Sequence, residues 1–277
     1  MSFTRRSFLL NGIKTIVAIG AANTIQSFRA GAFALPPANK IQMRFAIASD
    51  GHYGQPNTPF EAQHLEMVNW LNAEKQHRGL DFTMINGDIF HNETANLPLV
   101  KANWDKLTMP YHVSHGNHDM IDEAAWLATW QTPWHYTFEH KDNAFLVLNT
   151  ADDKGNYISP DAAYTREQLT QLAGKKKLFV FMHITPFNWT KGGLPCPDIV
   201  ALFNKQENLK AVFHGHDHNM DDVKENEGKF YFFDAHIGGS WGTDYRGYRI
   251  VEILKNGTIL TYQTNPANAS MVNSKTL

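Results

Sequence analysis

Five short polar clusters stand out in this sequence of 277 residues, because each follows an apolar run and carries side chains that bind metal ions. Aspartate, asparagine and histidine recur in the clusters, and cysteine is absent from them. Carboxylate, carboxamide and imidazole groups together suit Mn, Fe or Zn better than a soft metal. The clusters are Ser49-Asp50-Gly51-His52, Gly87-Asp88, His115-Gly116-Asn117-His118-Asp119, His183 and His214-Gly215-His216-Asp217-His218.

The number of candidate ligands favours two metal ions over one. A structural zinc ion takes four protein ligands, so seven are too many for a single tetrahedral site. Seven ligands suit two ions that share a carboxylate at a separation of about 3.5–4 Å. We therefore predict a binuclear centre of Mn, Fe or Zn ions. The predicted ligands are Asp50, His52, Asp88, Asn117, His183, His216 and His218.

The rest of the chain alternates between apolar runs and helical segments, and ends in strands alone. Short runs rich in β-branched and aromatic residues predict buried strands. Ligands gather beyond the carboxyl ends of strands in α/β sheets, so five of these strands would deliver their clusters to one place. The pattern predicts an α/β fold with mixed sheets flanked by helices. The predicted strands are Met43–Ala48, Asp81–Asn86, Tyr111–Ser114, Ala144–Asn149, Leu178–Met182, Ala211–Phe213, Phe230–Asp234, Tyr248–Leu254 and Thr258–Gln263.

Three helix starts are predicted from capping signals. Thr58 precedes Glu61 by three residues, and Thr165 precedes Gln168 by three, which is the spacing of a capping box. Asp198 is expected to cap a third helix.

Taken in order, the five clusters resemble the motifs of the calcineurin-like metallophosphoesterase superfamily. That pattern is D-x-H, G-D, G-N-H-[DE], a lone H after a strand, and G-H-x-H, and all five blocks occur between residues 50 and 218. The resemblance implies a four-layer αββα fold, a mixed β-sandwich flanked by helices, over residues 35–277.

The resemblance also implies a role for each residue. His118 would not bind metal; it would donate a proton to the leaving oxygen or stabilise the phosphoryl oxygens, and Asp119 would orient it. The implied reaction is hydrolysis of a phosphate ester by a hydroxide that bridges two metal ions, with phosphodiesters favoured over monoesters. The first ion would take Asp50, His52 and His218, the second Asn117, His183 and His216, and Asp88 would bridge both.

Several features leave the substrate open. Purple acid phosphatases of this superfamily carry a tyrosine three residues after the bridging aspartate, where this chain has His91, so the tyrosinate-bound iron type is not expected. Trp189 and Trp241 lie in loops expected to rim the site, where they would either stack on an aromatic leaving group or serve hydrophobic packing. Sulfatase, phosphonatase and phospholipid-directed activities are alternatives within the hydrolases. A non-catalytic, metal-dependent scaffold that binds a partner is the alternative outside them.

The first 34 residues differ from the rest, because they hold four basic residues and no acid. The run Thr4-Arg5-Arg6-Ser7-Phe8-Leu9-Leu10 resembles a twin-arginine export signal, and Ala32-Phe33-Ala34 is a small-x-small cleavage pattern. The segment predicts recognition by the twin-arginine export machinery and a periplasmic or otherwise exported protein. A retained membrane anchor is the alternative.

Charge limits the partners. Without residues 1–34 the chain carries 21 Lys and Arg against 27 Asp and Glu, a net charge of −6. We therefore expect no polymeric nucleic acid as a partner, and a small-molecule phosphoester as the substrate.

Overall fold

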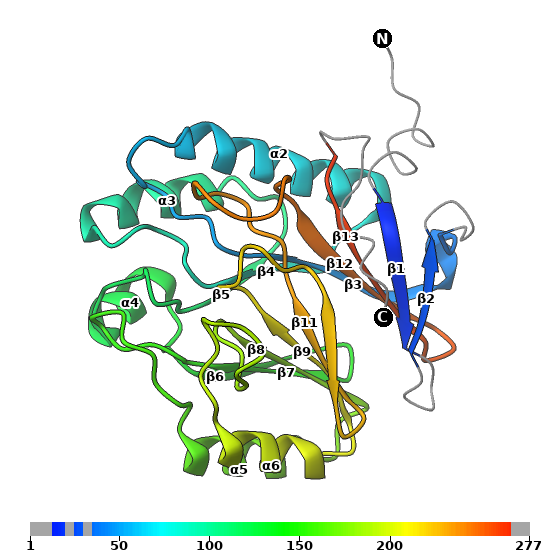
Figure 1. Cartoon of the computed structure of the whole chain (residues 1–277). Coiled ribbons are helices and arrows are strands. Elements are labelled where there is room, and N and C mark those ends of the chain that lie inside the picture. The colour runs from blue at the N-terminus through cyan, green and yellow to red at the C-terminus, as the bar shows by residue number, and fades with distance from the viewer. Residues whose placement is uncertain (1–12, 20–24, 30–34, 267–277) are drawn as a thin grey trace.

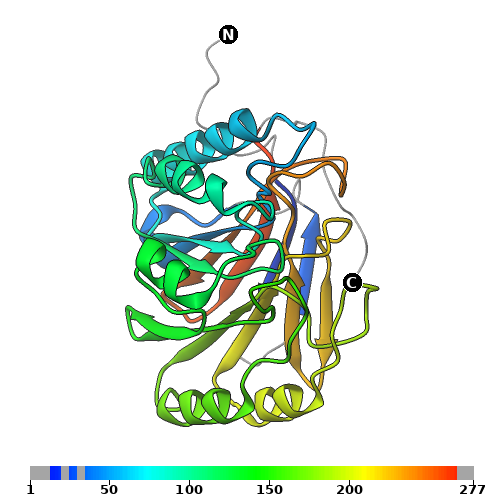
Figure 2. The same cartoon turned by 90° about the vertical axis from the view of Figure 1, so that its left-hand side faces the viewer.

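Two β-sheets stack face to face, and helices cover both outer surfaces (Figure 1 and Figure 2). The computed structural model describes residues 13–19, 25–29 and 35–266. Parallel strands form the middle of the smaller sheet and one end of the larger sheet, and the remaining strands pair antiparallel. The larger sheet has the order β2-β1-β13-β12-β3-β4-β5, and the smaller has the order β10-β11-β9-β8-β7-β6.

The strands of the larger sheet are β1 (Ile13–Ile19), β2 (Ile25–Arg29), β3 (Ile41–Ala48), β4 (Phe82–Asn86), β5 (Tyr111–Ser114), β12 (Tyr248–Leu254) and β13 (Ile259–Thr264). Those of the smaller sheet are β6 (Tyr136–His140), β7 (Asn143–Leu148), β8 (Lys177–Met182), β9 (Leu209–His214), β10 (Val223–Asn226) and β11 (Lys229–Phe233). The helices are α2 (Phe60–Arg78), α3 (Leu97–Trp104), α4 (Glu123–Trp130), α5 (Ala162–Gln171) and α6 (Pro197–Lys205), with short 3-10 helices at Ala38–Lys40 and Thr94–Asn96.

Three hydrophobic layers hold the four layers of structure together. Helices α2 and α3 pack on the outer face of the larger sheet through residues such as Met67 and Leu71. Helices α5 and α6 pack on the outer face of the smaller sheet through Leu169 and Phe203. A third cluster, rich in phenylalanine, fills the space between the sheets. The observed architecture is the predicted four-layer αββα fold.

The strand predictions are confirmed, with bounds that differ by at most two residues. Strands β1, β2, β6 and β10 were not predicted; of these, β2, β6 and β10 lie at sheet edges and pair with one neighbour only. Alternation of Tyr, Phe and Thr marks β6, but the strand ends in the polar residues Glu139 and His140, which weakens the apolar signal.

The three predicted helices exist, but their predicted caps are wrong. Thr58 donates its hydroxyl to the carbonyl of Gln55 instead of capping α2, whose N-cap position is Pro59. Helix α5 begins earlier than expected, because the carboxylate of Asp161 accepts the N–H groups of Ala163 and Tyr164. Helix α6 has Cys196 at its N-cap and Pro197 in its first turn, so Asp198 lies inside the helix.

Part of the predicted export segment forms β-strands. Residues 13–19 form β1, which pairs with β13, and residues 25–29 form β2 at the sheet edge. Arg5-Arg6 and Ala32-Phe33-Ala34 lie outside the described residues. The export signal and the periplasmic destination therefore stay predictions. Among the described residues, no helix has both the length and the apolar character that crossing a bilayer requires.

Phe45 on β3 joins the two sheets. It is fully buried and stacks on Phe82 at a ring-centroid distance of 4.9 Å. Its edges meet Phe145, Phe179 and Phe213 of the opposite sheet at 5.6, 5.7 and 6.4 Å.

Phe45→Ala should lower the free energy of unfolding by about 3–5 kcal/mol, because it opens a cavity between the sheets. Urea unfolding followed by circular dichroism measures this change. Leu127→Ala, at a side chain that is 46% exposed, is the control and should change the value by less than about 0.5 kcal/mol. A loss below about 1 kcal/mol in Phe45→Ala would show that the sheets are not joined by this contact.

Candidate metal centre

The five polar clusters lie at the carboxyl ends of strands from both sheets. The segments after β3, β4 and β5 come from the larger sheet, and those after β8 and β9 come from the smaller one. The buried side chain of Asn86, at the end of β4, ties these ends together. It accepts a hydrogen bond from the Ser114 hydroxyl and donates one to the carbonyl of Phe213. The tips of both sheets therefore meet at one point.

The structure brings six of the seven predicted ligands into two neighbouring groups. Within each group the candidate ligand atoms all lie within 4.8 Å of one another. His183 Nε2 lies 3.2 Å from Asp88 Oδ2, and His218 Nε2 lies 3.1 Å from Asp50 Oδ1. His52 Nε2 lies 3.6 Å from Asp88 Oδ2, which links the two groups. One group is Asp50, His52 and His218, and the other is Asp88, His183 and His216.

The seventh predicted ligand, Asn117, lies in the loop after β5. The backbone N–H of the next residue, His118, donates to Asp88 Oδ1 at 2.8 Å, which holds this loop against the second group. Asn117 is 7% exposed, and its Oδ1 has no hydrogen-bond partner. A buried acceptor without a partner is costly, so this oxygen fits a role as a metal ligand.

Backbone contacts select the nitrogen that two of the imidazoles offer. His183 Nδ1 lies 2.8 Å from the carbonyl oxygen of Asn86, and His218 Nδ1 lies 3.1 Å from that of Trp241. In each case Nδ1–H donates to a carbonyl, so Nε2 is the nitrogen that faces the centre and would bind a metal ion. His183 Nε2 is buried and has no hydrogen-bond partner, as such a ligand requires.

Burial and mutual proximity strongly shift the pKa values of the group. Burial would raise the pKa of Asp88, but His183 and His52 outweigh it and lower the pKa well below its usual value. Burial would lower the pKa of His183, but Asp88 and Asp50 outweigh it and raise the pKa to about 10. Burial lowers the pKa of His52 to about 3. The carboxylates are thus ionised, and cations fit beside them.

The backbone is strained at several of these positions. Asp50, His52, Asp88 and His216 have φ values of 58°, 46°, 51° and 66°, in the left-handed region that non-glycine residues rarely adopt. Strained residues of this kind cluster at functional sites.

His118 lies beside the two groups and remains partly exposed. Its ring stacks on His91 at 4.8 Å, and its Nδ1 lies 2.8 Å from Asn92 Oδ1. This geometry corrects the predicted role of Asp119, whose carboxylate instead accepts the backbone N–H groups of Gly116, Ile89 and Phe90. Asp119 shapes the loops, and Asn92 orients His118.

Three contacts of the centre were missed in the sequence. The Tyr157 hydroxyl lies 2.9 Å from His216 Nε2, although it comes from the loop after β7, which carries no ligand motif. Asn92 follows Asp88 by four residues in the same loop, so its nearness to His118 could have been suspected. His91 was noted only for departing from a family pattern, yet its Nδ1 lies 3.0 Å from His52 Nδ1.

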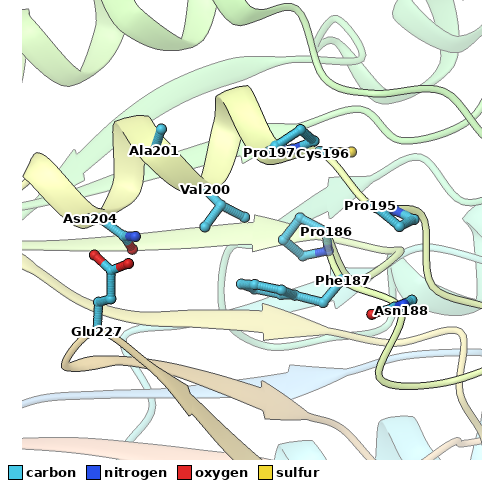
Figure 3. Close-up of a pocket in the computed structure, with 10 residues that line it drawn as sticks. All are labelled: Pro186, Phe187, Asn188, Pro195, Cys196, Pro197, Val200, Ala201, Asn204 and Glu227. Carbon is cyan, nitrogen blue, oxygen red and sulfur yellow. The ribbon is translucent and has the colours of Figure 1, made fainter.

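The two aromatic loops take different places. Trp241 stacks on His218 at 4.4 Å and so borders the centre, as predicted. Trp189 stacks on Phe187 at 3.8 Å, and both pack on Tyr231, so Trp189 serves hydrophobic packing. Phe187 also lines a pocket of about 400 Å³ that runs between α6 and the turn at Glu227 (Figure 3). None of the predicted ligands lines this pocket.

Gly215 offers a test of the ligand arrangement. A Cβ atom there would clash with Ser49 Oγ and would lie 2.6 Å from Asp50 Oδ2 and 3.0 Å from His183 Nδ1. Gly215→Ala should therefore weaken metal affinity about 10- to 100-fold, as loss of supporting contacts around a ligand does. Titration with Mn or Zn, followed by metal analysis of the dialysed protein, measures the effect.

Gly174→Ala is the matched control, because a Cβ at that exposed position meets no atom within 4 Å. It should bind metal like the parent chain. Equal metal affinity in both variants would mean that the ligands do not converge around Gly215.

The comparisons with known proteins agree with this geometry. The family model for calcineurin-like phosphoesterases matches residues 43–220. A dimetal phosphatase from Danio rerio superposes with a TM-score of 0.66 at 11% identity, covering 81% of this chain and 96% of its own. The GAP50 protein, described as the anchor in the inner membrane complex of Plasmodium, gives 0.63 at 16% identity, covering 84% and 88%.

The calcineurin-like phosphoesterase YfkN from Bacillus subtilis gives a TM-score of 0.53 at 9% identity, covering 84% of this chain and 93% of its own. At such identities the likeness concerns the fold. The search of curated proteins found no match. The matched family region holds all five clusters and the strands that end in them, and this chain belongs to the calcineurin-like phosphoesterase family, hydrolases that act on phosphoester bonds.

Proposed function

We propose that this chain is a binuclear metal-dependent phosphodiesterase. The observation that carries the proposal is the pair of ligand groups, which share the space around Asp50 and Asp88. The first ion would take Asp50, His52 and His218, and the second Asn117, His183 and His216, with Asp88 between them. When bound, the two ions would supply a hydroxide nucleophile at neutral pH and neutralise the phosphoryl oxygens.

The reaction also needs a proton for the leaving group, and a residue of the protein would supply it. Hydrolysis forms a bond between water oxygen and phosphorus and breaks the ester P–O bond, so the leaving oxygen needs a proton. His118 is partly exposed beside the centre, and Asn92 Oδ1 holds its Nδ1–H. Its Nε2 can then carry the proton that goes to the leaving oxygen.

The charge around the centre favours a diester over a monoester. In the described chain, Asp50 and Asp88 pair with imidazoles and accept hydrogen bonds from backbone N–H groups. A dianionic monoester gains more than a monoanionic diester from an added Lys or Arg. Because no Lys or Arg is among these contacts of Asp50 and Asp88, we expect the diester, which carries less charge, to be preferred.

Reconstitution tests the reaction type. We expect purified protein loaded with Mn, Zn or Fe to hydrolyse bis(p-nitrophenyl) phosphate with a kcat/KM at least about tenfold above that for p-nitrophenyl phosphate. A tenfold preference corresponds to a difference of about 1.4 kcal/mol between the two activation free energies. Chelated protein is the control. A preference for the monoester would make the chain a phosphatase.

Replacement of His118 tests the proton donor. His118→Ala should keep both metal ions and lower kcat on a diester of a poorly acidic alcohol by about 10²–10⁴-fold. The loss should shrink for a p-nitrophenolate leaving group, which needs little protonation. Equal losses on both substrates would remove proton donation from the role of His118.

A metal-dependent scaffold is the second candidate function. The Plasmodium neighbour is described as an anchor, which shows that the fold is compatible with such a role. Two bound ions without hydrolysis across a broad phosphoester panel would favour the scaffold.

A further inference from the structure

We infer that Trp241 is a stacking platform for a planar leaving group, such as an aryl group or a nucleobase-bearing group. The inference rests on the proposed function, because it places a part of the substrate beside His118. The inference assigns the class of substrate, a phosphodiester with a planar leaving group, from the side chains that border the centre.

Three aromatic rings form a parallel array at the first ligand group. The His218 ring lies 12° from parallel with His236 at 5.1 Å and 9° from parallel with Trp241 at 4.4 Å. His236 is 5% exposed, whereas Trp241 is 41% exposed. The array thus runs from the interior to the surface and ends in a large ring that solvent reaches. Such a ring can accept another planar group, because offset stacking is favourable at these distances.

The loop that carries Trp241 is held firmly against the centre. The N–H of Gly238 donates to the carbonyl of Asp50, and the N–H of Thr243 donates to the carbonyl of His218. A Cβ on Gly242 would lie 2.9 Å from the Cβ of His218, so the backbone passes very close to this ligand. The Trp241 carbonyl itself accepts from His218 Nδ1. A platform fixed in this way loses little entropy when it binds a substrate.

The position of Trp241 points to the leaving group. Its ring centroid lies 6.5 Å from that of His118 and 5.0 Å from that of His52. An oxygen within hydrogen-bond distance of His118 would place an attached ring within stacking reach of Trp241, since aromatic pairs interact at about 4.5–7 Å.

The rest of the rim has the same character. Six large hydrophobic side chains are exposed in the described chain, and two besides Trp241 are the adjacent Tyr157 and Ile158. Tyr157 contacts the ligand His216 in the second group. Tyr157 and Trp241 are thus two exposed aromatic side chains in contact with predicted ligands, as the lining of a ligand site would be.

A matched pair of diesters isolates the stacking. Methyl benzyl phosphate and methyl cyclohexylmethyl phosphate have leaving alcohols of similar size and acidity, and only the first is planar. The loaded parent chain should prefer the benzyl ester by about 5- to 150-fold in kcat/KM, since one stacked ring contributes about 1–3 kcal/mol. Trp241→Ala should reduce the preference to within about twofold, and Trp241→Phe should keep part of it.

The variants need two controls. Leu99 is an exposed side chain on α3, and Leu99→Ala should keep the preference of the parent chain for the benzyl ester. Metal content is measured for every variant, because the Trp241 backbone contacts a ligand. Calorimetric binding of benzylphosphonate against cyclohexylmethylphosphonate repeats the comparison without turnover, and Trp241→Ala should lose the difference there too.

The outcomes separate this inference from the proposed function. Hydrolysis of both diesters without a planar preference, or an equal loss on both in Trp241→Ala, would overturn the stacking role and leave the phosphodiesterase intact. Failure of the loaded parent chain to hydrolyse either diester would refute the function, and phosphonate binding would then decide the stacking by itself.

Discussion

Two carboxylates buried side by side are the constraint on which the rest of this structure depends. Asp50 and Asp88 are at most 1% exposed, and burial of an uncompensated charge costs far more than a domain can offset. Their contacts are imidazoles and the N–H groups of His216 and His118. Those groups come from both sheets, so the charge of the carboxylates is balanced only when the sheets are stacked. Two metal ions would add the largest compensating charges and would couple metal binding to folding.

The same constraint explains the strained backbone. A left-handed conformation costs roughly 1–2 kcal/mol at a residue with a side chain. At Asp50 and His52 the conformation is held by N–H groups that donate to the carbonyls of Gly87 and Asp88, which joins the loops after β3 and β4. Glycine takes the crowded neighbouring positions: a Cβ at Gly116 would clash with the backbone of Asp88. Strain at the ligands and glycine beside them are two consequences of packing five loops around one pair of charges.

This packing also shows what could be predicted from the sequence. The strands and the residues at their ends were predictable. An apolar run indicates a buried strand, and the Asp, Asn or His that follows it indicates where the strand ends. The helix caps were mispredicted because Thr58 and Thr165 match a local pattern, while the chain uses Pro59 and Asp161. The role expected for Asp119 failed for another reason. A carboxylate next to His118 in sequence points away from it in space, towards three backbone N–H groups, and only the turn geometry reveals this.

Tyr157, which was missed, and the choice between Trp189 and Trp241 mark the limit of sequence reasoning here. Metal ligands must have particular chemistry, so they leave a motif, whereas rim residues need only a suitable surface and leave none. Trp189 and Trp241 were equivalent in the sequence, since each lies in a glycine-containing aromatic loop after a strand. The structure distinguishes the two tryptophans by the side chains on which each one stacks. Trp189 rests on Phe187 and Tyr231, which form an apolar layer, and Trp241 rests on His218, a predicted ligand. Selectivity for the substrate would therefore reside in the long loop between β11 and β12, beyond the matched family region, while the chemistry resides within it.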